Sequence, residues 1–224
     1  MRLTLVVSAG ALLVAGAAAS SPADAKTRLS CHLLRDAAND THIGTPQAAV
    51  PSDEPALDIV GADVAVDNRW VTTAIDVRSL KEMSNSSVVP GPWRWSVRFN
   101  AAGTTYMFHG RLGQGDAFGE VLRTYILDDS TDSWAESGPM VRATVHFDQQ
   151  RRQVRVTVPR HALDPLGGVP LGERITGLHA YSWHEHTAYT EYFNQPGGEY
   201  DMADAASSTA SYVAGAASCV KPGS

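Results

Sequence analysis

Short segments in which apolar and polar residues alternate run along most of this chain, and turn residues separate them. Residues 93–100 read WRWSVRFN, which places apolar Trp93, Trp95, Val97 and Phe99 on one face and polar Arg94, Ser96 and Arg98 on the other. A period of two is typical of a half-buried β-strand. Long segments with a helical period are missing from the sequence. The pattern therefore predicts an all-β protein.

Two hairpins follow from turn chemistry. The apolar run at 57–66 and the alternating run at 69–80 are joined by Asp67-Asn68. Residues 142–148 and 153–159 alternate on both sides of the charged turn DQQRR, and we expect their apolar residues to be buried: Ala143, Val145, Phe147, Val154, Val156 and Val158. Residues 159–163 then predict one short helical turn.

The remaining segments complete a fold prediction. Residues 174–186 and 187–193 predict two more strands, whereas the Ala/Ser-rich stretch 202–217 predicts a loop or a short strand. Residues 26–55 predict an irregular lead-in. About eight or nine short strands with frequent turns indicate an antiparallel two-sheet β-sandwich, jelly-roll-like in kind.

The first 25 residues have the pattern of a signal peptide. Arg2 precedes an apolar stretch, and Ala23-Asp24-Ala25 fits the small-x-small rule for cleavage. An uncleaved anchor is the alternative. We expect a secreted, extracellular protein with one domain over 26–224 and no membrane insertion after the signal is removed. A formal net charge of −6 without basic blocks argues against nucleic acid as a partner.

The chain has two cysteines, Cys31 and Cys219, near the two ends of the expected mature domain. Disulfides form and persist in the compartments that secreted proteins enter. We therefore predict a Cys31–Cys219 disulfide that joins the termini. Two unpaired thiols are the alternative.

Three sets of residues are candidates for ligand chemistry. Acidic residues gather at Asp36, Asp40, Asp53, Glu54 and Asp58, and hard oxygen ligands of this kind suit calcium. A solvated acidic loop is the alternative reading. His184, His186 and Glu191 can place two imidazoles and a carboxylate on one transition-metal ion, as in a metal-binding protein or metal-dependent enzyme. Exposed strand histidines are the alternative.

The third candidate is Trp134, which lies in the polar stretch DDSTDSWAESG and can stack on a ligand such as a sugar, or plug a loop over the core. The sequence contains neither a G-x-S-x-G motif nor a glycine-rich phosphate loop after residue 25. We expect no catalytic residues.

Three segments resemble secreted bacterial β-sandwich domains related to DOMON domains and family 9 carbohydrate-binding modules. They are CHLLRDAAND at 31–40, PALDIVGADV at 55–64 and FDQQRRQVRVTVPRHAL at 147–163. The resemblance implies a binding or accessory module that holds structural calcium through Asp36, Asp40 and Asp58. This chain departs from the opening motif with Ala37 in place of proline and Asn39 in place of glycine.

The functional expectation is a secreted, non-catalytic binding module for polysaccharide or cell-envelope glycan. Two alternatives stay open. One is a metal site at the H-x-H motif, and the other is a structural domain that binds an envelope protein.

Overall fold

The computed structural model of the chain describes residues 31–43, 50–51, 54–81, 93–113, 116–128, 133–185 and 200–223. These ranges are mostly antiparallel β-structure with one short 3-10 helix. The elements are β1 (Leu34–Arg35), β2 (His42–Ile43), β3 (Val50–Pro51), β4 (Ile59–Val66), β5 (Trp70–Val77), β6 (Trp93–Ala101), β7 (Thr104–Gly113), β8 (Asp116–Asp128), β9 (Ser133–Asp148), β10 (Gln153–Pro159), η2 (Arg160–Leu166), β11 (Arg174–Glu185), β12 (Tyr200–Ser208) and β13 (Tyr212–Val213).

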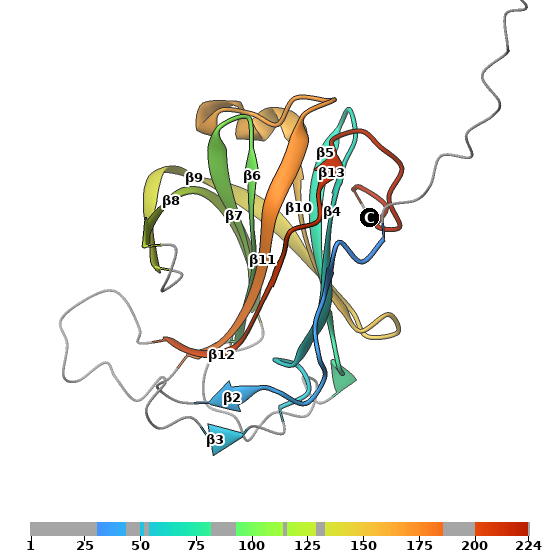
Figure 1. Cartoon of the computed structure of the whole chain (residues 1–224), viewed down its shortest axis with the longest axis vertical. Coiled ribbons are helices and arrows are strands. Elements are labelled where there is room, and N and C mark those ends of the chain that lie inside the picture. Colours follow the sequence, from blue (N-terminus) through green and yellow to red (C-terminus); the bar gives the residue numbers. More distant parts are fainter. Residues whose placement is uncertain are drawn as a thin grey trace, which may run out of the picture.

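One curled sheet contains all of these strands except β2 and β3, which pair with each other (Figure 1). Its path is β1-β4-β5-β10-β9-β8-β7-β6-β11-β12, and β13 pairs with β11 outside this path. Strand β9 changes partner along its length, because residues 133–143 lie against β8 and residues 144–148 lie against β10. The all-β prediction is therefore confirmed.

The curl brings the two ends of the sheet path together. The Asp204 carboxylate on β12 accepts a hydrogen bond of 2.7 Å from the backbone N–H of Ile59 on β4. The Ser208 hydroxyl at the end of β12 donates a hydrogen bond of 2.6 Å to the carbonyl of Leu33. Side chains thus join β12, the last strand of the path, to β4 and to the residue before β1.

Both predicted hairpins are present. β4 pairs with β5, and β9 pairs with β10. The first turn is fixed by Asp67, whose Oδ1 accepts hydrogen bonds of 2.7 Å from the backbone N–H groups of Arg69 and Trp70. In such an Asx turn, the side chain of the first turn residue stabilises the reversal of the chain direction. The predicted helical turn after β10 is η2, which ends at Gly167 with a left-handed φ of 114°.

The main core lies on the face of the sheet that the alternating apolar residues share. It includes Trp95 and Phe99 of β6, Phe108 of β7 and Val156 of β10. The indole N–H of Trp95 donates a hydrogen bond of 2.8 Å to the carbonyl of Ala56, so the one polar atom of this ring is satisfied. The predicted apolar face of 93–100 is therefore confirmed.

The prediction that this strand is only half-buried is wrong. Ser96 is 0% exposed and Arg98 is 1% exposed, although both lie on its polar face. The Arg98 guanidinium carbon lies 5.7 Å from the centre of the Tyr181 ring. Polar residues on this face are buried because they contact aromatic and polar neighbours instead of water.

Two further expectations need correction. The sequence predicts a loop or a short strand over 202–217, but β12 covers residues 200–208 and pairs along β11. Its core positions carry the small side chains of Ala203 and Ala206, and the pairing with β11 shifts register between Met202 and Asp204. The described part of the lead-in contains β1, which pairs with Gly61 and Ala62 of β4 and buries Leu34 completely.

The predicted disulfide joins Cys31 to Cys219 across a sequence separation of 188 residues. Figure 1 shows the C-terminal end beside the first described residues. The prediction that a disulfide joins the termini is therefore confirmed, and residues 1–25, expected to form a signal peptide, lie outside the described ranges.

Candidate functional site

Three carboxylates from distant parts of the chain meet where the lead-in crosses the beginning of β4. We call Asp36, Asp40 and Asp204 the acidic cluster. One oxygen of each carboxylate lies within 4.8 Å of an oxygen of the other two. Asp36 and Asp40 come from the loop after β1, whereas Asp204 comes from β12.

Backbone contacts hold the cluster in place. The N–H of Asp36 donates a hydrogen bond of 3.3 Å to the carbonyl of Val60, which ties the loop to β4. Asp36 Oδ1 accepts a hydrogen bond of 2.9 Å from the N–H of Ala37. Asp36 Oδ2 is buried and has no hydrogen-bond partner. Asp204 is 8% exposed, and its Oδ2 accepts the bond from Ile59 described above.

Asp58, the third residue of the predicted calcium set, lies beside the cluster and is 0% exposed. Its Oδ2 accepts a hydrogen bond of 2.9 Å from the N–H of Asn39 and lies 2.9 Å from Nε of Arg78. Arg78 Nη1 donates a hydrogen bond of 2.7 Å to the side-chain carbonyl of Asn39. Asp58 Oδ1 is buried without a hydrogen-bond partner. One oxygen of Asp58 therefore fixes the loop, and the other is free of hydrogen bonds.

Asn39 allows the loop to turn without a glycine. Its φ is 70°, in the left-handed region that glycine normally supplies. Asparagine is one of the few other residues that tolerate this conformation. The backbone at this position thus keeps a glycine-like conformation.

The acidic cluster is electrostatically unfavourable when all of its carboxyls are ionised. Burial, followed by the charges of Asp36 and Asp40, raises the pKa of Asp204 to about 7. Burial, with Asp40 and Asp58 nearby, also raises the pKa of Asp36. Carboxyl groups that crowd together without a compensating positive charge favour protonation or a bound cation.

The donor set of the cluster fits calcium, the ion that the sequence resemblance implies. Every candidate donor is a carboxylate oxygen, which is the ligand type that hard divalent cations prefer. The buried Oδ2 of Asp36 has no hydrogen-bond partner to displace. Asp204 is the residue that sequence reasoning missed, because β12 lies far from the lead-in along the chain.

The other predicted site residues are only partly described. The backbone of His184 lies in β11, opposite Trp93 of β6, while His186 and Glu191 lie outside the described residues. The backbone of Trp134 lies in β9, opposite Ile126 of β8. The side chains of His184 and Trp134 belong to the part of the chain that is not described.

A second buried layer covers the sheet face opposite the main core. It contains Met107, Leu122, Tyr181 and Trp183, and the Tyr181 and Trp183 rings stack with their centres 5.2 Å apart. Beside it, the Ser96 hydroxyl contacts Nδ1 of His109. Burial, helped by the charge of Arg94, holds the pKa of His109 well below its usual value. A neutral imidazole in this layer packs as part of the fold.

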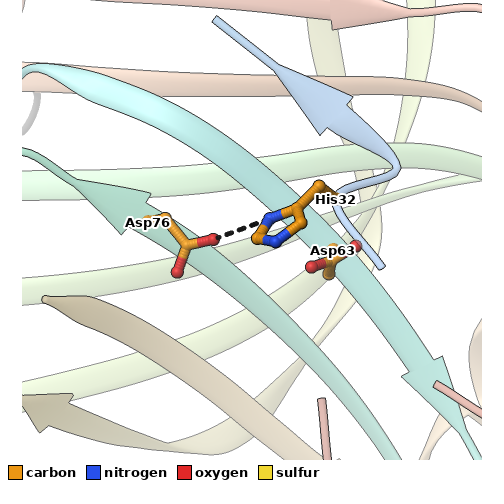
Figure 2. A group of neighbouring side chains, drawn as sticks. All are labelled: His32, Asp63 and Asp76. Carbon is orange, nitrogen blue, oxygen red and sulfur yellow. Dashed lines mark ion pairs between the residues drawn. The ribbon is translucent and has the colours of Figure 1, made fainter. Parts of the chain in front are cut away.

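A second group of metal-ligating side chains lies on the outer surface of β4 and β5. Figure 2 shows the imidazole of His32 between the carboxylates of Asp76 and Asp63. One ligand atom of each residue lies within 4.8 Å of those of the other two. Sequence reasoning missed this group because the three residues lie in separate segments, and only the β4–β5 hairpin register brings the two aspartates together.

No helix within the described ranges has the length and apolar character that crossing a membrane requires. The metal-binding chemistry of the acidic cluster and of the group His32, Asp63 and Asp76 is inferred from their own donor atoms. Comparison of the chain with protein-family models, with curated proteins and with solved structures finds no match.

Proposed function

We propose that the protein is a secreted, non-catalytic binding module that recognises polysaccharide or cell-envelope glycan and holds calcium at the acidic cluster. The observation that carries this proposal is the set of crowded carboxylates at Asp36, Asp40 and Asp204, with the unpartnered oxygen of Asp36 among them. This set joins the lead-in to the last long strand of the sheet. A cation there stabilises a rigid scaffold for recognition.

Extracellular action is supported by two features of the chain. The Cys31–Cys219 disulfide suits an oxidising compartment. Residues 1–25 have the composition of a signal peptide. Both are typical of a protein that leaves the cytoplasm.

The curled sheet supports a two-sheet, jelly-roll-like sandwich of eight or nine main strands. Side chains of β4 and β5, such as Val64 and Ile75, share one core with Trp95 and Phe99 of β6. Packing of this kind is typical of a sandwich core between two layers. The change of partner along β9 supports a crossing from one layer to the other at this strand.

Calcium would be held by Asp36, Asp40 and Asp204, and its role there is structural. When bound, it supplies the positive charge that the cluster lacks. The Asp58–Arg78 pair holds the loop, so that Asp36 and Asp40 face Asp204. Because ligands come from the loop and from β12, binding ties two segments that are far apart in sequence.

The choice of glycan as ligand rests on resemblance and on surface chemistry. Segments 31–40, 55–64 and 147–163 resemble family 9 carbohydrate-binding modules and their relatives. The net charge of −6 disfavours polyanions. Tyr181 is 1% exposed and Trp183 is 9% exposed, so these rings support the sheet and Trp134 remains the aromatic residue proposed for sugar stacking.

A depletion assay tests the proposal. Purified mature protein is incubated with insoluble polysaccharides and cell-wall preparations, in calcium or in chelator. Specific retention on one glycan, reduced by Trp134→Ala, supports the module and this residue. Retention on none of them would contradict glycan binding and direct the search to an envelope protein.

Calorimetric titration with calcium tests the cation separately. We expect one binding event, which Asp204→Asn abolishes. The matched control is Asp164→Asn, a change at an exposed aspartate of η2 outside the cluster. Equal calcium binding by the wild type and the Asp204 variant would exclude the acidic cluster.

A further inference from the structure

His32, Asp63 and Asp76 form a compact group on the outer surface of the β4–β5 hairpin. Nδ1 of His32 lies 3.7 Å from Oδ2 of Asp76. Asp63 lies under the imidazole on the neighbouring strand (Figure 2). This group shares no residue with the acidic cluster.

The hairpin register places both carboxylates on one face. Asp76 of β5 stands opposite Gly61 of β4, and Asp63 follows two residues after Gly61. Residues two apart on a strand project to the same side of the sheet. A Cβ built at Gly61 would lie 3.1 Å from the carbonyl oxygen of Leu34 and 3.5 Å from Oδ2 of Asp76. The glycine thus allows the close approach of β1 beside this face.

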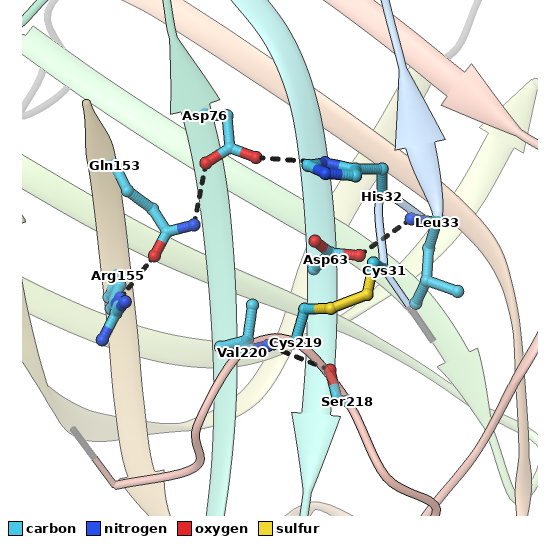
Figure 3. A network of polar contacts seen from close by, with 10 residues as sticks. All are labelled: Cys31, His32, Leu33, Asp63, Asp76, Gln153, Arg155, Ser218, Cys219 and Val220. Atoms are coloured by element: carbon cyan, nitrogen blue, oxygen red, sulfur yellow. Dashed lines mark hydrogen bonds and ion pairs between the residues drawn. A yellow bond between two sulfur atoms is a disulfide. The ribbon is translucent and has the colours of Figure 1, made fainter. Parts of the chain in front are cut away.

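The disulfide holds the histidine over this pair. His32 directly follows Cys31, which is bonded to Cys219 (Figure 3). The backbone of His32 has a left-handed φ of 53°. Its side chain is 51% exposed, so a dissolved ion can reach the imidazole, whereas Asp63 is 3% exposed and forms the floor of the group.

Each carboxylate has one oxygen fixed by a neighbour. Asp63 Oδ1 accepts a hydrogen bond of 2.8 Å from the N–H of Leu33. Asp76 Oδ1 accepts a hydrogen bond of 2.8 Å from Nε2 of Gln153, whose carbonyl accepts one from Nε of Arg155. Figure 3 shows this chain of contacts leading from β10 to the histidine. Protein metal sites typically have such neighbouring residues, which hydrogen-bond to the metal ligands and orient them.

The spacing of the ligand atoms suits a metal better than a direct hydrogen bond. Charge-assisted N–H···O bonds are about 2.7–2.9 Å long, shorter than the 3.7 Å between His32 and Asp76. Two ligands of a tetrahedral zinc ion, each bonded at about 2.0–2.2 Å, lie roughly 3.3–3.6 Å apart. A shift of a few tenths of an ångström brings the observed pair into this range.

We propose that His32, Asp63 and Asp76 bind a divalent transition-metal ion, of which Zn²⁺ is the representative, at a site separate from the proposed calcium cluster. The imidazole nitrogen determines this choice, because nitrogen ligands favour zinc-like ions over calcium. Three protein ligands leave a coordination position for water or for an external ligand.

Burial makes the ionised form of both carboxyls costly. Burial raises the pKa of Asp63 and also that of Asp76. The hydrogen bond from Gln153 and the charges of His32, Arg152 and Arg155 lower the pKa of Asp76, but the net change is still upward. A divalent ion between the carboxylates relieves this cost directly.

Zinc calorimetry on the full oxidised protein tests the site. The background variant carries His184→Ala and His186→Ala, so that the other predicted histidine site cannot contribute. We expect one zinc ion per chain, with affinity reduced at least 30-fold by His32→Ala and by Asp76→Asn. Gln153→Ala removes only an orienting contact and is expected to weaken zinc binding about 10-fold.

Matched controls separate this site from unspecific binding. His161→Ala removes an exposed histidine of η2, and Asp204→Asn removes a carboxylate of the acidic cluster. Both variants are expected to keep zinc affinity within 2-fold. Circular dichroism checks that His32→Ala and Asp76→Asn are folded, and folding is expected because neither side chain is fully buried.

Cobalt supplies an independent readout. Co²⁺ at a site with one nitrogen and two carboxylate ligands gives visible absorption that should disappear in the folded His32→Ala variant and in no control. The proposal is overturned if the background variant binds no zinc, or if folded His32→Ala and Asp76→Asn bind it as tightly as their parent.

Discussion

Raising the pH of the calcium-free protein is expected to lower its stability through Asp204. The pKa of this carboxyl is 3.8 in its unperturbed state and about 7 in the fold. Between these values the folded state binds more protons than the unfolded state, so stability falls as pH rises. The loss is complete above about pH 7, where the Asp204 carboxyl is ionised beside Asp36 and Asp40.

The size of the effect follows from the shift. Each pKa unit corresponds to about 1.4 kcal/mol, so a rise from 3.8 to about 7 gives roughly 4 kcal/mol as an upper limit. Asp40 is exposed and Asp36 is partly exposed, and solvent screens their part of the repulsion. We expect an observed loss of about 2–4 kcal/mol.

Urea unfolding at about pH 5 and about pH 8, with and without calcium, measures this loss. Asp204→Asn keeps the shape of the side chain and removes its charge. In chelator the wild type should lose up to about 2.7 kcal/mol of stability relative to the variant between these two pH values, because about two pH units of the window between 3.8 and about 7 lie above pH 5. Calcium should stabilise only the wild type. Parallel pH curves for the two proteins, or equal stabilisation of both by calcium, would refute the reasoning.

Three further predictions concern the scaffold and are measured by urea unfolding. Replacing Cys31 and Cys219 by serine should lower the free energy of unfolding by up to about 5 kcal/mol, because the disulfide closes a loop of 188 residues; an unchanged value would contradict this entropic role. Trp95→Ala should lower the free energy of unfolding by about 3–5 kcal/mol. Met140→Ala, at a position that is 57% exposed, should change it by less than about 0.5 kcal/mol. Similar losses in both variants would contradict the assigned core. Arg78→Ala should cost about 2 kcal/mol, since it leaves a buried carboxylate unpaired; no loss would show that the pair is not needed.

Local sequence signals predicted the parts of the fold that local chemistry determines. The β4–β5 hairpin follows from Asp67, which holds its own turn. β12 escaped prediction because its described buried positions are two alanines and Asp204, which give weak apolar alternation. The burial of Ser96 and Arg98 also escaped, since it depends on neighbours across the sheet such as His109 and Tyr181.

The candidate sites also depend on contacts between distant segments, which local sequence signals do not show. Asp36 and Asp40 are close in sequence and meet in the structure, as their spacing suggested. Asp204 joins them only because the curled sheet brings β12 beside β4. The partners of His32 depend on the hairpin register and on the disulfide, neither of which is a spacing in the sequence.

Residues 31–40 connect the disulfide with both candidate metal sites. This segment supplies His32 to one site and Asp36 with Asp40 to the other, while the sheet supplies the remaining ligands. A cation at either site therefore stabilises the docked segment, which includes the β1 pairing with β4. An ion that orders this segment reduces the ordering entropy that the second ion must offset, so the two sites should bind with positive coupling. Hydrogen exchange at the Leu33 amide, which donates to Asp63, is the direct observable of that coupling.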